Sequence, residues 1–291
     1  MKIHSLILMT VLFFGCSQNL TSKMTTSQTQ KSSIINGTPV TADNSLGKSV
    51  VGLFMKSDSD EAWFQSCTGS VLTSKFILTA AHCVNGLDAG NILVHFSLNT
   101  MTSENQANPA KRIHDVEAKF VTRRVKAFMI HPDYRGVGDY DLALLMLEEN
   151  TPKTAIPVQL LPDQYLNRDE AKTTLEGQRH QVKLMGFGLV SEDPVVETEM
   201  MRETVVSSHF IDHFVVTDQT QGSGGCNGDS GGPAFLTLGK ETYQVGVTHG
   251  PHGRSRSCSE QGEWFNPALD QGFLKKAQQM MSGASSAQVL K

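Results

Sequence analysis

The chain has 291 residues, which is enough for one or two domains, and it has an ordinary globular composition with 39% apolar and 19% charged residues. Its formal net charge of −4 at pH 7 is small for this length. Because a nucleic-acid-binding surface is normally basic, this balance argues against a nucleic-acid partner.

The first 16 residues are typical of a secretory signal. Lys2 provides a positively charged start, and an apolar run at 6–14 follows it. The run is too short to cross a bilayer, which takes about 20 apolar residues. Gly15-Cys16 at its end resembles the lipobox of bacterial lipoproteins, so we expect an exported protein held at the bacterial membrane (periplasm or outer membrane) by a lipid on Cys16. The alternative is an ordinary signal peptide of a secreted protein, in which Cys16 has no such role.

Residues 17–33 are polar and contain few large apolar side chains. Such a segment cannot bury enough apolar surface to fold by itself. We expect a flexible tether or a propeptide here, followed by a folded part at residues 34–291.

The folded part is predicted to consist mainly of short β-strands. Short apolar runs separated by turns indicate an all-β barrel or sandwich. The runs lie at 50–55, 68–72, 76–79, 92–96, 125–130, 142–147, 180–185, 201–206, 214–216, 233–237 and 243–247. Apolar residues then recur at helical spacing between 267 and 281, which predicts an amphipathic helix.

Three segments carry the residue types that acyl transfer needs. Ser230 lies in the glycine-rich stretch GCNGDSGGP, whose glycines permit a tight loop with several N–H groups directed to one point. A nucleophilic hydroxyl needs a base, and the base needs an orienting group. His82 lies in LTAAHC, and Asp141 begins DLALL. In this order the segments resemble the chymotrypsin/trypsin-type serine endopeptidases, and the resemblance runs from residue 34 to about 279.

The resemblance implies an all-β fold with two six-stranded antiparallel β-barrels. We expect the barrels at about 34–150 and 158–265, the active site between them, and the C-terminal helix at about 267–281. Protein or peptide substrates and no cofactor are implied as well.

The resemblance also assigns roles to single residues. Ser230 is expected to be the nucleophile, His82 the general base and Asp141 the carboxylate that orients the base. The backbone N–H groups of Gly228 and Ser230 are expected to form the oxyanion hole. Asp139 is a rival carboxylate, but Asp141 directly precedes the apolar run, as the family's Asp does.

The segment Ile34-Ile35-Asn36-Gly37 resembles the N-terminus that is created when a zymogen of this family is cut. The resemblance implies an ion pair between the new ammonium of Ile34 and Asp229. Ser33 precedes the cut, so self-cleavage after Lys or Arg is not supported and a separate activating protease is expected. The alternative is that Ile34-Ile35 is merely the start of a strand.

The five cysteines fit this resemblance. Cys67 and Cys83 flank the His82 motif, Cys226 and Cys258 flank the Ser230 motif, and the family has a disulfide at each place. Cys16 is then left over, as a lipid-bearing cysteine would be. Paired cysteines are typical of an oxidising compartment.

Substrate preference depends on a few positions. In trypsin-like enzymes an Asp six residues before the catalytic Ser selects Arg and Lys, but here Gly224 stands at that position. Thr248-His249-Gly250 matches the segment that pairs with the substrate backbone, usually Ser-Trp-Gly. One interpretation is an open apolar pocket. Another is that Glu263 supplies a charge from the opposite wall, and a third is that Glu263 is a solvated loop residue.

The sequence offers two further possibilities, a metal site and an inactive homologue. Histidine pairs at His209/His213 and His249/His252 are spaced like metal ligands, but they lack a third ligand at a known spacing, so no metal is expected. A catalytically inactive protease homologue that acts as a surface-binding lipoprotein is the alternative to an enzyme. The intact Ser, His and Asp motifs favour the enzyme.

Overall fold

The structure is a computed structural model, and it describes residues 34–58, 63–100, 116–136, 140–162, 165, 175–196, 198–252 and 257–283. The expected signal, Cys16 and the tether at 17–33 lie outside the described residues, as does Asp139. In the part of the chain that is described, no helix is long and apolar enough to cross a membrane.

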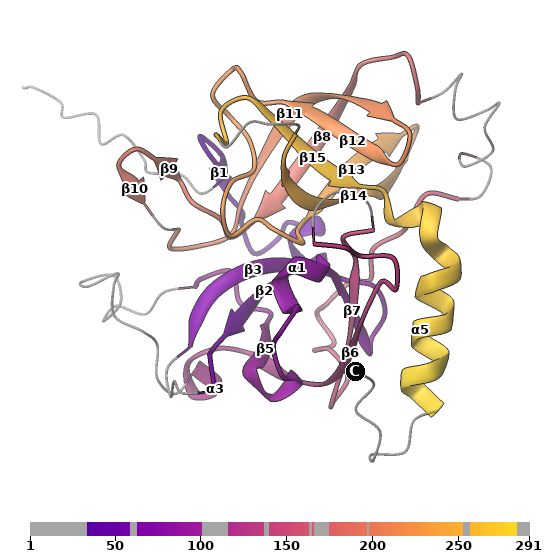
Figure 1. The fold of residues 1–291 in the computed structure, drawn as a ribbon. Coiled ribbons are helices and arrows are strands. Elements are labelled where there is room, and N and C mark those ends of the chain that lie inside the picture. The colour runs from indigo at the N-terminus through magenta and orange to yellow at the C-terminus, as the bar shows by residue number, and fades with distance from the viewer. Residues whose placement is uncertain are drawn as a thin grey trace, which may run out of the picture. The chain divides into compact units, whose positions relative to one another are not determined.

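The first barrel is a closed antiparallel sheet of six strands, drawn from indigo to magenta in Figure 1. Its order around the barrel is β2-β3-β4-β7-β6-β5. The strands are β2 (Val50–Met55), β3 (Phe64–Val71), β4 (Phe76–Thr79), β5 (Ile92–His95), β6 (Thr122–Ile130) and β7 (Ala143–Leu147). Every residue of β2, β4, β5 and β7 is buried, which agrees with their mainly apolar sequences; Thr79 and His95 are the polar residues among them.

The second barrel also closes with six strands. Neighbouring strands follow the order β11-β12-β15-β14-β13-β8, and the pairing of β8 with β11 completes the ring. They are β8 (His180–Gly186), β11 (Arg202–Ile211), β12 (Phe214–Asp218), β13 (Pro233–Leu238), β14 (Glu241–Pro251) and β15 (Gln261–Phe265). The expected fold of two six-stranded antiparallel barrels is therefore confirmed.

Strand β15 was absent from the predicted runs. Its sequence QGEWF has only two apolar residues, Trp264 and Phe265, so it carries no apolar run that marks a strand. The segment is a strand because it forms backbone hydrogen bonds with both β12 and β14, which the local sequence does not indicate.

The N-terminal segment belongs to the second barrel, although the sequence grouped it with the first. Strand β1 (Thr38–Pro39) pairs with β11, and Ile34 is buried in the same apolar cluster as Trp264. Burial of Ile34, which is 1% exposed, explains why the chain crosses over before it starts the first barrel.

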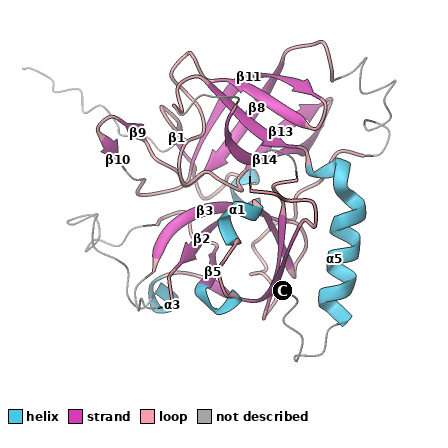
Figure 2. Cartoon of the chain, viewed as in Figure 1, coloured by secondary structure: helices cyan, strands magenta, loops and turns pink. Residues whose placement is uncertain are grey.

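The C-terminal helix is confirmed and returns to the first barrel. Asn266 caps a short 3-10 turn, η4 (Pro267–Asp270), by accepting a hydrogen bond from the N–H of Ala268, and α5 (Gln271–Gly283) follows. Figure 2 shows α5 as the longest of the described helices, beside the strands of the barrels. Its buried residues Leu274, Ala277 and Met281 pack into the core of the first barrel.

The remaining elements are short. They are η1 (Leu46–Ser49), α1 (Ala81–Val84), η2 (Ala89–Asn91), α3 (Val116–Lys119), β9 (Ser191–Glu192) and β10 (Val195–Val196).

Candidate active site

The three residues expected to act together come from both barrels. His82 lies in α1 directly after β4, and Asp141 lies two residues before β7. Ser230 lies in the loop that leads into β13 of the second barrel. A hydrogen bond of 2.8 Å from the N–H of Thr68 in β3 to the carbonyl of Ser230 holds this loop against the first barrel.

Asp141 orients His82 through two hydrogen bonds. Nδ1 of the His82 ring lies 2.6 Å from Oδ2 of Asp141, and the backbone N–H of His82 donates to Oδ1 at 2.9 Å. Burial opposes ionisation of the carboxyl, but the hydrogen bonds from His249 and His82 outweigh it and hold the pKa of Asp141 below its usual range. Asp141 is therefore an ionised acceptor that fixes the tautomer of His82 with the proton on Nδ1.

The residue before Asp141 has an unusual backbone. Tyr140 adopts a φ of 63°, in the left-handed region that a bulky residue rarely occupies. Its ring stacks on His131, with 4.6 Å between the ring centroids. Such strain is found where neighbouring contacts hold the backbone in place, and here it lies next to the carboxylate of the site.

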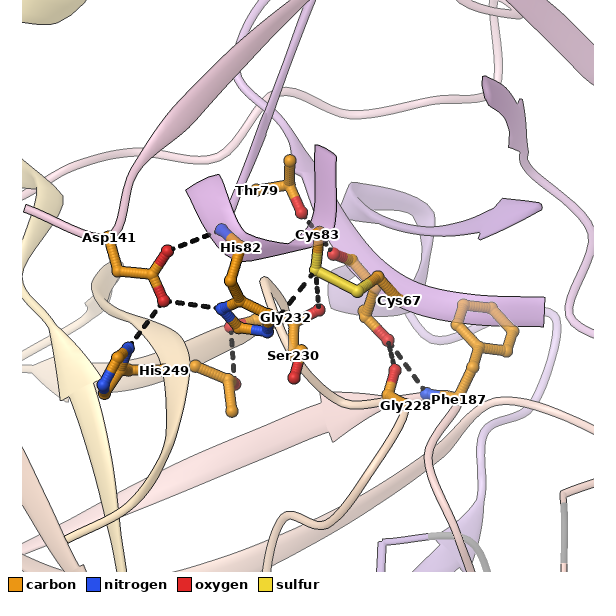
Figure 3. The surroundings of a disulfide bond; sticks show 12 residues. Cys67, Thr79, His82, Cys83, Asp141, Phe187, Gly228, Ser230, Gly232 and His249 are labelled. Carbon is orange, nitrogen blue, oxygen red and sulfur yellow. Dashed lines mark hydrogen bonds and ion pairs between the residues drawn. A yellow bond between two sulfur atoms is a disulfide. The ribbon is translucent and has the colours of Figure 1, made fainter. Parts of the chain in front are cut away.

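Ser230 lies on the side of His82 that faces away from Asp141, as Figure 3 shows. No hydrogen bond joins its hydroxyl to Nε2 of His82 in the structure. Such contacts are often long in a free enzyme and shorten when substrate binds. The arrangement is compatible with proton transfer from the Ser230 hydroxyl to the His82 ring.

The loop before Ser230 leaves two backbone donors unused. The N–H groups of Gly228 and Ser230 donate to no acceptor within the described residues. Gly228 has a φ of 96°, and a Cβ atom there would lie 2.8 Å from the Cα atom of Gly188, so only glycine fits. The Gly228 carbonyl is held by Thr68 Oγ1 at 2.8 Å. Two N–H groups near the nucleophile are what an oxyanion hole requires.

Asp229 is buried without a cation beside it among the described residues. Its carboxylate accepts hydrogen bonds from the N–H groups of Gly188 at 2.8 Å and Cys226 at 2.9 Å. Burial raises the pKa of Asp229 to about 7, although these two hydrogen bonds oppose the shift. The ion pair expected with Ile34 needs a free N-terminus, which the continuous chain does not have.

The start of the folded part lies close to this loop. Ile35 exchanges two backbone hydrogen bonds with Gly224, of 2.9 Å and 3.2 Å, and so forms an isolated antiparallel bridge. Ile34 has a φ of 46°, which is strained for a β-branched residue. The segment expected to become the N-terminus is thus bound to the residue six positions before Ser230.

Two disulfides brace the site. Cys67 and Cys83 are joined beside His82, and Cys226 and Cys258 join the Ser230 loop to the segment before β15. Both pairs are those expected from the resemblance.

The expected substrate-binding residues have additional neighbours. A Cβ atom on Gly224 would lie 2.1 Å from Cδ of Gln219, so the Gln219 amide fills the space where trypsin-like enzymes carry their Asp side chain. Gln219 is held by the N–H of Gly225 at 2.6 Å and the carbonyl of Cys258 at 2.7 Å. Gln219 was not predicted as a site residue, because it lies five residues before Gly224 and no local pattern in the sequence marks it.

Trp264 closes the space further. Its indole packs between Gly225 and Gly262. A Cβ atom added to Gly225 would lie 3.2 Å from Cζ2 of Trp264, and one added to Gly262 would lie 2.2 Å from Cζ3. The Trp264 indole and the Gln219 amide therefore occupy the space next to Gly225 and Gly224. Recognition of β15 as a strand would have placed Trp264 and Gly262 on the same face.

Three histidines that are spaced like metal ligands in the sequence, His249, His252 and His213, contact other side chains in the structure. Nδ1 of His249 lies 2.6 Å from Oδ2 of Asp141, and Nδ1 of His252 lies 2.5 Å from Oε2 of Glu263. The ring of His213 stacks on Phe265. The contact of His249 with Asp141 was not predicted, since His249 was expected only as a wall of the substrate site.

The comparisons with known proteins agree with this geometry. The family model described as Trypsin matches residues 34–264. The chain is 29% identical over 201 residues to the venom serine protease Bi-VSP of Bombus ignitus, covering 64% of this chain and 52% of that protein. It is 30% identical over 192 residues to a chymotrypsin of Phaedon cochleariae, covering 62% of each chain.

A further relative is the brachyurin of Leptuca pugilator, 28% identical over 199 residues, which are 64% of this chain and 76% of that protein. The matched region thus spans between about half and three quarters of the length of these three relatives. The match to the family model covers most of the chain and includes His82, Asp141 and Ser230. The chain belongs to the trypsin family of serine proteases.

Proposed function

We propose that the protein is a serine endopeptidase that cleaves protein or peptide substrates through an acyl-enzyme at Ser230. The observation that carries this proposal is the contact of His82 Nδ1 with the buried Asp141, beside a Ser loop with two unused N–H donors. Membership of the trypsin family supports the same reaction.

The geometry accounts for each step of the reaction. Nε2 of His82 takes the proton of the Ser230 hydroxyl as Oγ attacks the peptide carbonyl, and the resulting imidazolium is stabilised by Asp141. The N–H groups of Gly228 and Ser230 donate hydrogen bonds to the developing oxyanion, and each such donor is worth about 2.7–4 kcal/mol in the barrier. His82 then protonates the leaving amine. A water molecule, activated by His82 in the same way, attacks the acyl-enzyme and releases the acyl group.

The test is covalent labelling with a fluorophosphonate probe, which reacts with an activated serine. The wild-type protein cut before Ile34 should be labelled and should cleave a mixed peptide library. Ser230→Ala should lose both while keeping nearly the same thermal midpoint. If the cut wild-type protein is neither labelled nor active, the proposal of an enzyme is wrong. The alternative, a catalytically inactive homologue that acts as a surface-binding lipoprotein, is then favoured.

We also propose that the chain is made as a zymogen which a separate protease cuts between Ser33 and Ile34. Three observations support this proposal: the buried Asp229 with a pKa raised to about 7, the strained φ of Ile34, and the bridge from Ile35 to Gly224. A new ammonium at Ile34 would supply the charge that the buried carboxylate lacks. Full probe labelling of a chain shown by mass spectrometry to be uncut would overturn this proposal.

A lipid anchor at Cys16 is proposed from the sequence alone. The motive is the fifth cysteine, which is left over when the two disulfides form. Stable anchoring takes more than one acyl chain, as a fully modified lipoprotein has. Cys16→Ser should move the protein from the membrane fraction to the soluble fraction, and an unchanged membrane fraction would contradict the anchor.

A further inference from the structure

The buried carboxylate of Asp141 is shared by two imidazole rings. Oδ2 lies 2.6 Å from Nδ1 of His82 and also 2.6 Å from Nδ1 of His249. An ionised carboxylate only accepts hydrogen bonds, so both rings must carry a proton on Nδ1. Figure 3 shows the two rings approaching Asp141 from different sides, and their planes are 80° apart.

A local irregularity of β14 brings His249 to this place. The pairing of β14 with β15 shifts register between Thr248 and Gly250, which leaves His249 as the extra residue of a bulge. Bulges are known to redirect a side chain next to a functional site. The hydroxyl of Thr248 donates to the carbonyl of Gly232 at 2.9 Å. Strand β14 therefore contacts the Asp141 carboxylate through the side chain of His249, whereas the Thr248 hydroxyl bonds to Gly232.

Burial makes this second donor important. The Asp141 side chain is 0% exposed and that of His249 is 15% exposed, so water does not replace a lost hydrogen bond easily. A buried carboxylate needs its acceptor sites filled to stay ionised and to keep one orientation. The Nδ1–H of His249 therefore gives Oδ2 a second donor besides the His82 ring.

We propose that His249 is a positioning residue of the triad, whose Nδ1–H holds the Asp141 carboxylate in the orientation that directs His82 towards Ser230. This proposal rests on the proposed serine endopeptidase activity. It goes beyond the role of His249 as a wall of the substrate site, because it makes the turnover step depend on one hydrogen bond to Asp141.

Two substitutions separate this role from simple packing. His249→Phe keeps a ring but removes the donor, whereas His249→Asn places an amide N–H close to where Nδ1 lies. In probe-reactive preparations, His249→Phe should lower kcat by roughly tenfold to a hundredfold, the factor that a hydrogen bond to a charged group is worth. His249→Asn should recover most of the loss. His209→Phe, on strand β11 of the second barrel, is the matched control and should leave kcat unchanged.

A spectroscopic measurement tests the same contact without turnover. In the full-length Ser230→Ala protein, proton NMR should show two strongly downfield imidazole N–H signals, one from each ring on Asp141. His249→Phe in that background should remove one signal and leave the other. Equal kcat losses in the Phe and Asn variants, or two downfield signals in the Phe variant, would overturn the positioning role. If the protein has no activity but the number of downfield signals still falls from two to one in the Phe variant, the proposed enzymatic function is wrong, whereas the contact of His249 with Asp141 is correct.

Discussion

Nδ1 of His252 lies 2.5 Å from Oε2 of Glu263, so the carboxylate that the sequence offered as a substrate-binding charge already has a partner. The Glu263 side chain is 12% exposed, and it therefore does not behave as a solvated loop charge either. The indole of Trp264 and the amide of Gln219 occupy the space beside Gly225 and Gly224.

We therefore expect a preference for small apolar side chains at the residue before the scissile bond. Arg or Lys would have to lose hydration without a charged partner, which is costly, and Phe would meet the Trp264 indole. Peptides that differ only in Ala, Val, Phe or Arg at this position should be cleaved with the highest kcat/KM for Ala and Val. Glu263→Gln should leave this order unchanged. A strong preference for Arg that collapses in Glu263→Gln would show that Glu263 does act in substrate binding.

Cleavage before Ile34 should change how stability depends on pH. In the uncut chain the pKa of Asp229 is about 7, above its ordinary value of 3.8, so the folded state binds a proton more tightly than the unfolded state. Stability is then lost as pH rises from about 4 to about 7, by on the order of 4 kcal/mol. If the chain is activated as proposed, we expect an ammonium at Ile34 to offset this loss in the cut chain.

The measurement is the thermal midpoint of the cut and uncut proteins at pH 5 and pH 8. Side chains that titrate in both forms have effects that cancel in the difference, which leaves the Asp229 carboxyl and the new amino group of Ile34. The cut form should be more stable at pH 8, and the gap should shrink at pH 5. A gap that does not depend on pH would contradict pairing of Asp229 with the new N-terminus.

His95 should make the first barrel sensitive to acid. Burial lowers the pKa of His95 to about 3, and its Nε2 lies 2.7 Å from Oε1 of Gln65. In the unfolded chain the imidazole of His95 titrates near 6.5, so the folded state loses stability as pH falls from about 6.5 towards 3. His95→Gln keeps a donor for Gln65 and removes the titration.

The thermal midpoint of His95→Gln should therefore fall less steeply than that of the wild type between pH 6.5 and 4. At pH 7.5 the variant should be the less stable protein, because the His95 ring packs against Phe54 and Phe187. Parallel curves for the two proteins would mean that His95 does not control the acid response.

Removing the disulfide between Cys226 and Cys258 should destabilise the protein by about 3–4 kcal/mol, the chain-entropy value for a loop of this size. The bond spans 32 positions of sequence, whereas that between Cys67 and Cys83 spans 16. A Cys226→Ala/Cys258→Ala double variant should lower the thermal midpoint at least as much as the corresponding Cys67/Cys83 variant. It should also raise KM, because the bond ties the Ser230 loop to the segment that leads to Trp264. An unchanged KM would show that the loop keeps its shape without the bond.

Local sequence determined much of the fold and pointed to the candidate catalytic residues. The apolar runs of β2, β4 and β7 mark strands because each side chain there is buried, and the strand positions follow within a few residues. Gly228 and Gly231 next to Ser230 have φ values of 96° and 79°, which favour glycine at these positions, so this part of the motif is visible in the sequence itself.

Contacts between distant segments were decided only by the tertiary structure. Strand β15 exists because β12 and β14 pair with it, and β1 joins the second barrel because Ile34 is buried there. His249 and Asp141 are 108 positions apart, and nothing local to either one indicates their hydrogen bond. A side chain's neighbours across a barrel depend on register and on bulges, which the packing of the whole sheet sets rather than the residues next to it.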